Sequence, residues 1–127
     1  MKTVTTVSIA DVESLANRAG SHWFESSTMR FFKCRVAQTA QYIPADDVSD
    51  DNRDTGTYLF VSSEQGPHDV RRYSVRKVTI SRELREDGYN AFRFQVCTDG
   101  FQSHETQAKA KSAMKATIKE LSGAKVS

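Results

Sequence analysis

The hydrophobic pattern changes its period near the carboxyl end of the chain, and this change restricts the fold. Apolar and polar side chains alternate over residues 91–97, which predicts a strand with one buried face. Over residues 104–121 the apolar side chains recur every three or four positions, which predicts an amphipathic helix capped by Ser103 and ended by Gly123. The apolar stripe of this helix must cover a sheet or another helix, so we expect an α+β domain.

The remaining elements are predicted from shorter patterns. Residues 58–61 and 71–80 are predicted to be strands, with a bulge near Arg76 because the apolar face changes along the second one. Residues 9–19 and 28–41 show helical spacing of apolar side chains. We therefore expect two N-terminal helices, a three-stranded antiparallel sheet, and a C-terminal amphipathic helix packed on the sheet.

Length and composition indicate an ordinary folded domain. The 127 residues predict a single domain, 1–127, and the formal net charge is only +2. The two cysteines, Cys34 and Cys97, are far apart and form no disulfide or metal spacing, which is typical of a reduced cytoplasmic protein. No run of 18 apolar residues occurs, so we expect no membrane-spanning helix.

An acidic loop is predicted at residues 44–57, a segment without apolar periodicity that we expect to be flexible. Its spacing begins like a calcium-binding loop, but Thr55 stands where glycine is needed and Val61 where the final glutamate is needed. The loop is either a solvated surface or an acidic surface that faces a basic partner. Its acidic residues are Asp46, Asp47, Asp50, Asp51 and Asp54.

Residues 22–32 contain the only tryptophan and three of the seven phenylalanines. Large aromatic side chains of this kind usually contribute to a core. Trp23 or Phe31 could instead lie on the surface and anchor a protein partner, since aromatic residues are enriched at binding hot spots.

Two groups of basic residues suggest an alternative, a nucleic-acid-binding module. If one predicted strand and the polar face of the last helix adjoin, their cations could follow a phosphate backbone. The strand contributes Arg71, Arg72, Arg76 and Lys77, and the helix contributes Lys109, Lys111, Lys115 and Lys119.

Motifs for catalysis, metal binding and nucleotide binding are missing from the sequence. The three histidines have no zinc spacing, no GxSxG motif occurs, and the glycines do not form a phosphate-binding loop. We expect no cofactor and no metal, while an enzyme stays open because catalytic groups converge in space rather than in sequence. A further alternative is a protein that sequesters a small molecule such as a nucleotide, with a pocket near Trp23 that a homodimer would help to build.

Several segments together resemble a group of small uncharacterised proteins from bacteriophages and mobile elements. These segments are SHWF at 21–24, TMRFF at 28–32, FVSSE at 60–64, RYSVR at 72–76 and GFQ at 100–102. The resemblance implies a setting in the cytoplasm of a bacterial host but no activity and no site residues. Our leading expectation is a non-enzymatic phage accessory factor that binds and modulates or inhibits a host or defence protein complex.

Overall fold

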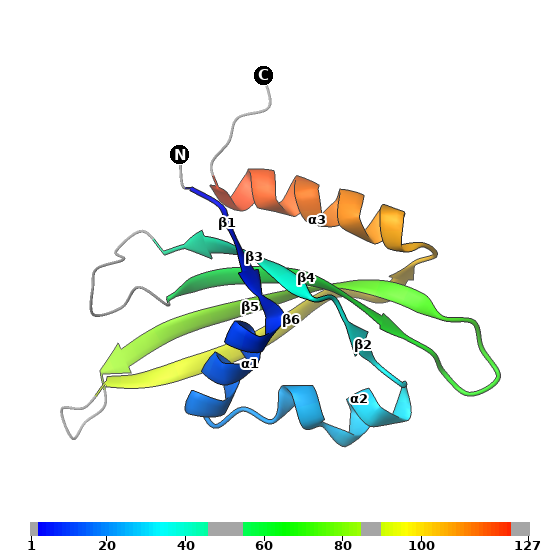
Figure 1. The fold of residues 1–127 in the computed structure, drawn as a ribbon, viewed down its shortest axis with the longest axis horizontal. Helices are drawn as coiled ribbons and strands as arrows, with labels where there is room; N and C mark the ends of the chain where they lie inside the picture. Colours follow the sequence, from blue (N-terminus) through cyan, green and yellow to red (C-terminus); the bar gives the residue numbers. More distant parts are fainter. Residues whose placement is uncertain (1–2, 46–54, 85–89, 123–127) are drawn as a thin grey trace.

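The computed structural model describes residues 3–45, 55–84 and 90–122 (Figure 1). The elements follow in the order β1 (Thr5–Ser8), α1 (Ile9–Arg18), the short 3₁₀ helix η1 (Trp23–Glu25), α2 (Ser27–Phe31), β2 (Arg35–Val36), β3 (Thr39–Pro44), β4 (Gly56–Glu64), β5 (Arg72–Leu84), β6 (Asn90–His104) and α3 (Gln107–Ser122).

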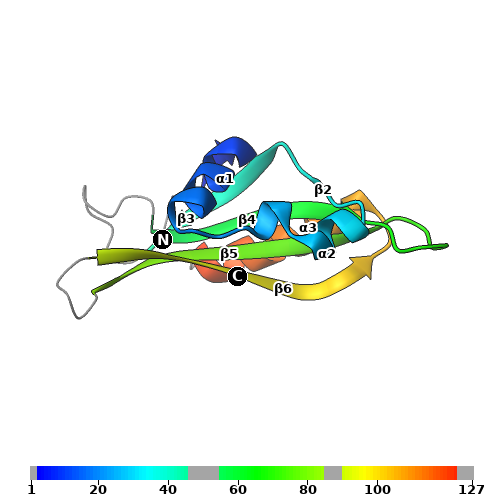
Figure 2. The ribbon, with the colours of Figure 1, turned by 90° about the horizontal axis from the view of Figure 1, so that it is seen from below.

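The strands of the described residues form one six-stranded antiparallel sheet in the order β1-β3-β4-β5-β6. β2 also pairs with β4, at the end of β4 that β3 does not reach. The long strands β5 and β6 run side by side along the molecule (Figure 2). The expected three-stranded sheet is therefore wrong, although the α+β class is right.

The error arose in the segment between the first two helices and β4. The predicted helix over 28–41 ends at Phe31, and residues 35–44 form β2 and β3 instead. Lys33 takes a positive φ of 48°, which ends the helix. Backbone hydrogen bonds to β4, such as the one from Ala37 N to Val61 O at 3.0 Å, then replace the helical ones. β1 was missed altogether.

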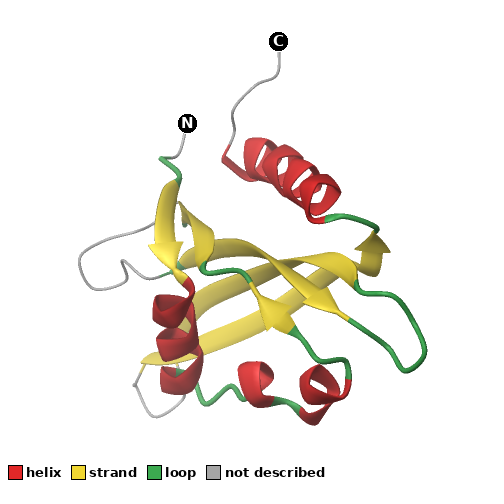
Figure 3. Cartoon of the chain, turned by 45° about the vertical axis from the view of Figure 1, so that its right-hand side comes forward, coloured by secondary structure: helices red, strands yellow, loops and turns green. Residues whose placement is uncertain are grey.

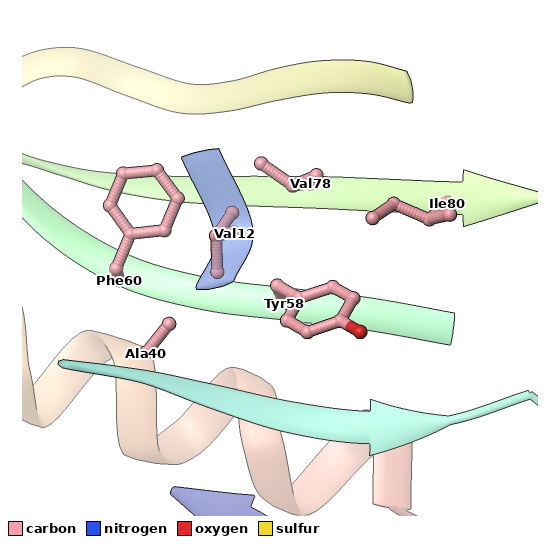
Figure 4. Close-up of a cluster of buried hydrophobic side chains, with 6 residues drawn as sticks. All are labelled: Val12, Ala40, Tyr58, Phe60, Val78 and Ile80. Carbon is pink, nitrogen blue, oxygen red and sulfur yellow. The ribbon is translucent and has the colours of Figure 1, made fainter. Parts of the chain in front are cut away.

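Helices cover both faces of the sheet, with α3 on one face and α1, η1 and α2 on the other (Figures 1 and 3). Under α1 and η1, six buried residues form one apolar core, namely Val12, Ala40, Tyr58, Phe60, Val78 and Ile80 (Figure 4). Under α3 lies a second core of Ile43, Leu59, Val61, Val75 and Ala110.

The covered faces explain why the bulge predicted near Arg76 is wrong. The register between β4 and β5 runs unbroken from Gly56 opposite Ile80 to Glu64 opposite Arg72. The irregularity lies against β6 instead, between Tyr73 and Val75. Both faces of β5 carry apolar residues because each face packs against its own helices.

The two outer helices agree with their sequence patterns. Ser8 caps α1 and accepts a hydrogen bond from Asp11 N at 3.3 Å. α3 begins later than expected, because β6 extends to His104 and Thr106 rather than Ser103 accepts the capping bond, from Lys109 N at 3.2 Å. Within the described residues, no helix is long and apolar enough to cross a membrane.

The acidic loop falls largely outside the described residues, which begin again at Thr55. Its five aspartates, Asp46, Asp47, Asp50, Asp51 and Asp54, are all outside. Its described ends belong to the sheet, since Pro44 is the last residue of β3 and Gly56 pairs with it at the start of β4.

Candidate functional site

A charged pair lies buried on the face of the sheet that η1 and α2 cover. Glu64 ends β4 and is 0% exposed, and Arg76 of β5 is 3% exposed. Side chains an even number of positions apart along a strand point to the same face, so Glu64 shares a face with Phe60. Phe60 is opposite Arg76 in the neighbouring strand, so Arg76 points to that face as well. Their carboxylate and guanidinium groups form an ion pair.

Hydroxyl groups form hydrogen bonds with both members of this pair. We call the five residues Ser62, Glu64, Ser74, Arg76 and Thr98 the polar centre. Ser62 and Ser74 donate to the two carboxylate oxygens of Glu64 at 2.7 and 3.0 Å. Arg76 donates from Nε to Ser62 Oγ at 2.8 Å and from Nη1 to Thr98 Oγ1 at 2.6 Å. Such hydrogen bonds offset the cost of removing both charges from water.

Aromatic rings enclose the guanidinium group of Arg76. Its Cζ lies 5.2 Å from the ring centroid of Trp23 and 5.2 Å from that of Phe101, a cation–π geometry on each. Trp23 also packs edge-to-face on Phe24, with the ring centroids 4.8 Å apart. Trp23, predicted as a candidate partner anchor, is thus partly buried against the polar centre.

Phe31, the other candidate anchor, is exposed and belongs to a row of three rings that we call the aromatic ridge: Phe31, Phe32 and Phe101. The ring centroids of Phe31 and Phe32 are 5.0 Å apart, and those of Phe32 and Phe101 are 5.3 Å apart, both edge-to-face. Phe31 is 60% exposed and Phe101 is 40% exposed. The ridge therefore presents apolar surface to solvent at one end and contacts Arg76 at the other.

Basic side chains lie around the ridge. Arg30 and Lys33 flank the Phe31–Phe32 pair in the chain and are exposed, and Arg71 donates to the backbone oxygen of Lys33 at 3.1 Å. Arg72 donates from Nε to the backbone oxygen of Gln102 at 2.7 Å, next to Phe101. An acidic residue, Asp69, also lies near Phe32, since a Cβ at Gly66 would be 3.8 Å from both side chains.

A cavity of about 280 Å³ opens beside Trp23, Met29 and Cys34. Burial raises the pKa of the Cys34 thiol, and the nearby Glu64 carboxylate raises it further, while Arg76 and Arg71 act in the opposite direction. The volume is slightly below the roughly 300–1,000 Å³ of small-molecule sites, so we assign no ligand to this cavity.

Two residues with strained backbone lie beside the polar centre. Lys33 has φ 48° and Gln102 has φ 59°, values that non-glycine residues rarely adopt. Gln102 is held there by its own N–H, which donates to Ser74 Oγ at 2.7 Å. The surrounding hydrogen bonds thus maintain the conformations that position both ends of the aromatic ridge.

The basic residues of the nucleic-acid hypothesis are not gathered into one stripe. Arg76 is buried, Arg71 and Arg72 donate to backbone oxygens, and Lys77 lies on the opposite face, under α3. The four lysines of α3, Lys109, Lys111, Lys115 and Lys119, are all exposed, and Lys109 pairs with Glu105 at 3.4 Å. Nucleic-acid binding stays a prediction.

Sequence reasoning missed most of the polar centre. Ser62, Ser63 and Glu64 follow the apolar run and lie beyond the end of the strand predicted over 58–61. A usable signal existed, since an antiparallel pairing of 56–64 with 72–80 brings a glutamate and an arginine onto one face. Their burial could not be inferred, because α2 and η1 come from a distant part of the chain.

The described residues contain no group of three histidine, cysteine, aspartate or glutamate side chains that could hold a metal ion. Every buried side-chain nitrogen and oxygen atom in the described part of the chain also has a hydrogen-bond partner.

Comparison with known proteins gives a family without a function. The model of a family of unknown function (DUF7447) matches residues 8–115, which include η1, α2 and the whole polar centre. No curated protein and no solved structure matches the chain.

Proposed function

The chain belongs to DUF7447, a family of unknown function, and we propose from the geometry of its site that it is a non-catalytic protein that binds another protein through the aromatic ridge. The observation behind this proposal is the exposure of Phe31 and Phe101, at 60% and 40%. Exposed aromatic side chains grouped on one surface are typical of interaction sites.

The ridge is also held rigidly, which favours binding. Phe101 packs on the guanidinium group of Arg76, and Phe32 packs between Phe101 and Phe31. Arg76 is itself bound by Glu64, Ser62 and Thr98. A pre-ordered contact surface loses little conformational entropy when a partner binds.

The charges around the ridge favour an acidic partner. Arg30, Lys33, Arg71 and Arg72 lie next to the ridge or donate to its neighbours. Opposite charges across an interface steer association and determine which partner is accepted. We therefore propose an acidic segment of a protein that inserts an apolar side chain against Phe31 and Phe101.

We also propose a biological setting for this binding. The resemblance of residues 21–24, 28–32 and 100–102 to bacteriophage proteins supports an accessory factor that acts on a host or defence complex. Two of these segments form the ridge itself. The acidic loop would contact a different, basic surface of such a complex.

Selection from a library of random twelve-residue peptides tests the proposal. Wild-type protein should enrich peptides with several acidic residues and at least one large apolar residue. The variant with Phe31→Ser and Phe101→Ser should lose this enrichment, because the apolar contact surface is gone.

A matched control is Val70→Ser, which removes an apolar side chain that is 66% exposed outside the ridge. This variant should select the same peptides as the wild type. Enrichment of basic peptides, or enrichment that survives the double substitution in a protein with unchanged circular dichroism, would contradict the proposal.

A further inference from the structure

α3 leaves a cavity of about 520 Å³ between itself and the sheet. This cavity lies on the face opposite to the polar centre, and its volume is within the roughly 300–1,000 Å³ of small-molecule sites. It arises because α3 turns small side chains, Ala113 and Thr117, toward this space. Its wall residues therefore do not fill the gap between helix and strands.

Part of the cavity wall is aliphatic, and the rest is polar or charged. Leu59 and Val75, 0% and 7% exposed, contribute from the sheet, and Ala113 and Leu121 contribute from α3. The four aliphatic side chains lie next to polar ones, which include the imidazole ring of His104. The aliphatic part of the wall offers a contact surface for a flexible hydrocarbon chain.

Lys77 places a cation in this apolar surrounding. It lies in the row Leu59–Lys77–Cys97 across three neighbouring strands, so its side chain starts from the middle of the covered face. Lysine is almost never fully buried unless it is paired, and Lys77 is partly buried. In the part of the chain that the structure describes, no carboxylate forms an ion pair with Lys77.

The cavity also contains polar groups, which affect whether a charged ligand can bind there. Ser103 and His104, at the end of β6, offer hydrogen-bonding side chains. Glu120 of α3 lines the cavity too, but it is an exposed residue whose charge is screened by solvent. The partly buried Lys77 therefore dominates the interaction with a ligand inside.

We propose that this cavity binds a small aliphatic carboxylate. The hydrocarbon chain would lie against Leu59, Val75 and Ala113, and the carboxylate would accept hydrogen bonds from Lys77 Nζ. This binding is separate from the protein-binding proposal because it uses the opposite face of the sheet, although Thr98 of the polar centre also lines the cavity.

Isothermal titration calorimetry with octanoate and with octanol tests the proposal, at concentrations below those at which either aggregates. The two probes have the same chain length but differ in charge. Wild-type protein should bind octanoate at least about tenfold more tightly than octanol, since a hydrogen bond to a charged group is worth that much. Lys77→Met, which keeps the length of the side chain, should remove the preference.

Two further variants locate the binding. Thr117→Leu, which adds volume inside the cavity, should weaken binding of both probes, whereas Lys115→Met on the exposed side of α3 should bind like the wild type. The double substitution of Phe31 and Phe101 should also have no effect. Absence of octanoate binding, or unchanged binding by Lys77→Met or Thr117→Leu in folded protein, would overturn the proposal.

Discussion

At the scale of single residues, Glu64 and Arg76 are the charged side chains that are buried in the described part of the chain. Each is almost fully buried, and each is bonded to the other and to neighbouring hydroxyl groups. Burying such a pair costs solvation energy that the hydrogen bonds only partly return, so the pair is better explained by the geometry it imposes than by net stability.

The first prediction concerns the removal of one charge. Glu64→Gln should lower the free energy of unfolding by about 3–5 kcal/mol, because the guanidinium group of Arg76 would stay buried without a counterion. Urea denaturation followed by circular dichroism measures this change.

The matched control is an exposed ion pair of the same type. Glu105→Gln breaks the pair with Lys109, whose side chains are 66% and 64% exposed, and should change stability by no more than about 1 kcal/mol. Equal losses for the two variants would show that the Glu64–Arg76 pair is not buried in solution.

The second prediction concerns the two cysteines. The pKa of Cys34 is raised, so at pH 8 a smaller share of this thiol is the reactive thiolate, and the side chain is partly covered as well. Cys97 is exposed. Iodoacetamide should therefore alkylate Cys97 faster than Cys34, as measured by mass spectrometry over time.

The raised pKa of Cys34 also determines how the stability of the protein changes with pH. Because folding raises the pKa of Cys34, the folded state holds the thiol proton more tightly than the unfolded state. This contribution to stability is present at neutral pH and is lost as the pH rises through the folded pKa. The Cys34→Ser variant should not lose this stability at alkaline pH. If the variant loses as much stability as the wild type, another group is responsible.

At the scale of elements, the start of β4 depends on Gly56. This residue has φ 146°, and an added Cβ would collide with the backbone oxygen of Ile43 and lie 2.9 Å from the ring of Tyr42. The strand pairing of β3 with β4 thus requires glycine at this position.

The third prediction compares two glycines. Gly56→Ala should destabilise the protein by about 3 kcal/mol or more, from backbone strain and the collision together. Gly20→Ala has a positive φ of 74° but open space around the new methyl group, and should cost only about 1–2 kcal/mol. Thermal unfolding of both variants measures which substitution costs more stability. Gly20→Ala would be the more costly one if β3 and β4 were not paired as described.

At the scale of the whole molecule, the sheet separates two surfaces of different character. One face supports the aromatic ridge through the polar centre, and the other, under α3, contains the aliphatic cavity. The cations predicted to bind nucleic acid are divided between these faces. A phosphate backbone can neutralise only those cations that lie along one continuous path.

The fourth prediction follows from this division. Binding to duplex DNA and duplex RNA should be weak at 50 mM salt and should change little at 200 mM, since few phosphates would be contacted. Fluorescence anisotropy with labelled duplexes measures both. A loss of affinity by a factor of about 1,000 between these salt concentrations would instead indicate six or more phosphate contacts and restore the nucleic-acid hypothesis.

Local patterns in the sequence were enough for the outer helices and for the centres of the long strands. α1 and α3 have complete apolar stripes, and the alternation in 91–97 lies within β6. The exposure of Phe31 was also among the expected alternatives, since its side chain lies off the apolar stripe of its helix. These features depend on neighbours within a few positions, which a sequence displays directly.

Tertiary structure alone decided the rest. The helical spacing over 28–41 predicted one helix, yet its second half belongs to β2 and β3, because the edge of β4 offers backbone hydrogen-bond partners. Arg76 was grouped with surface cations, yet it is buried because Glu64 and two aromatic rings from distant segments surround it. In both cases the deciding energy comes from groups more than ten positions away, and no local pattern reports it.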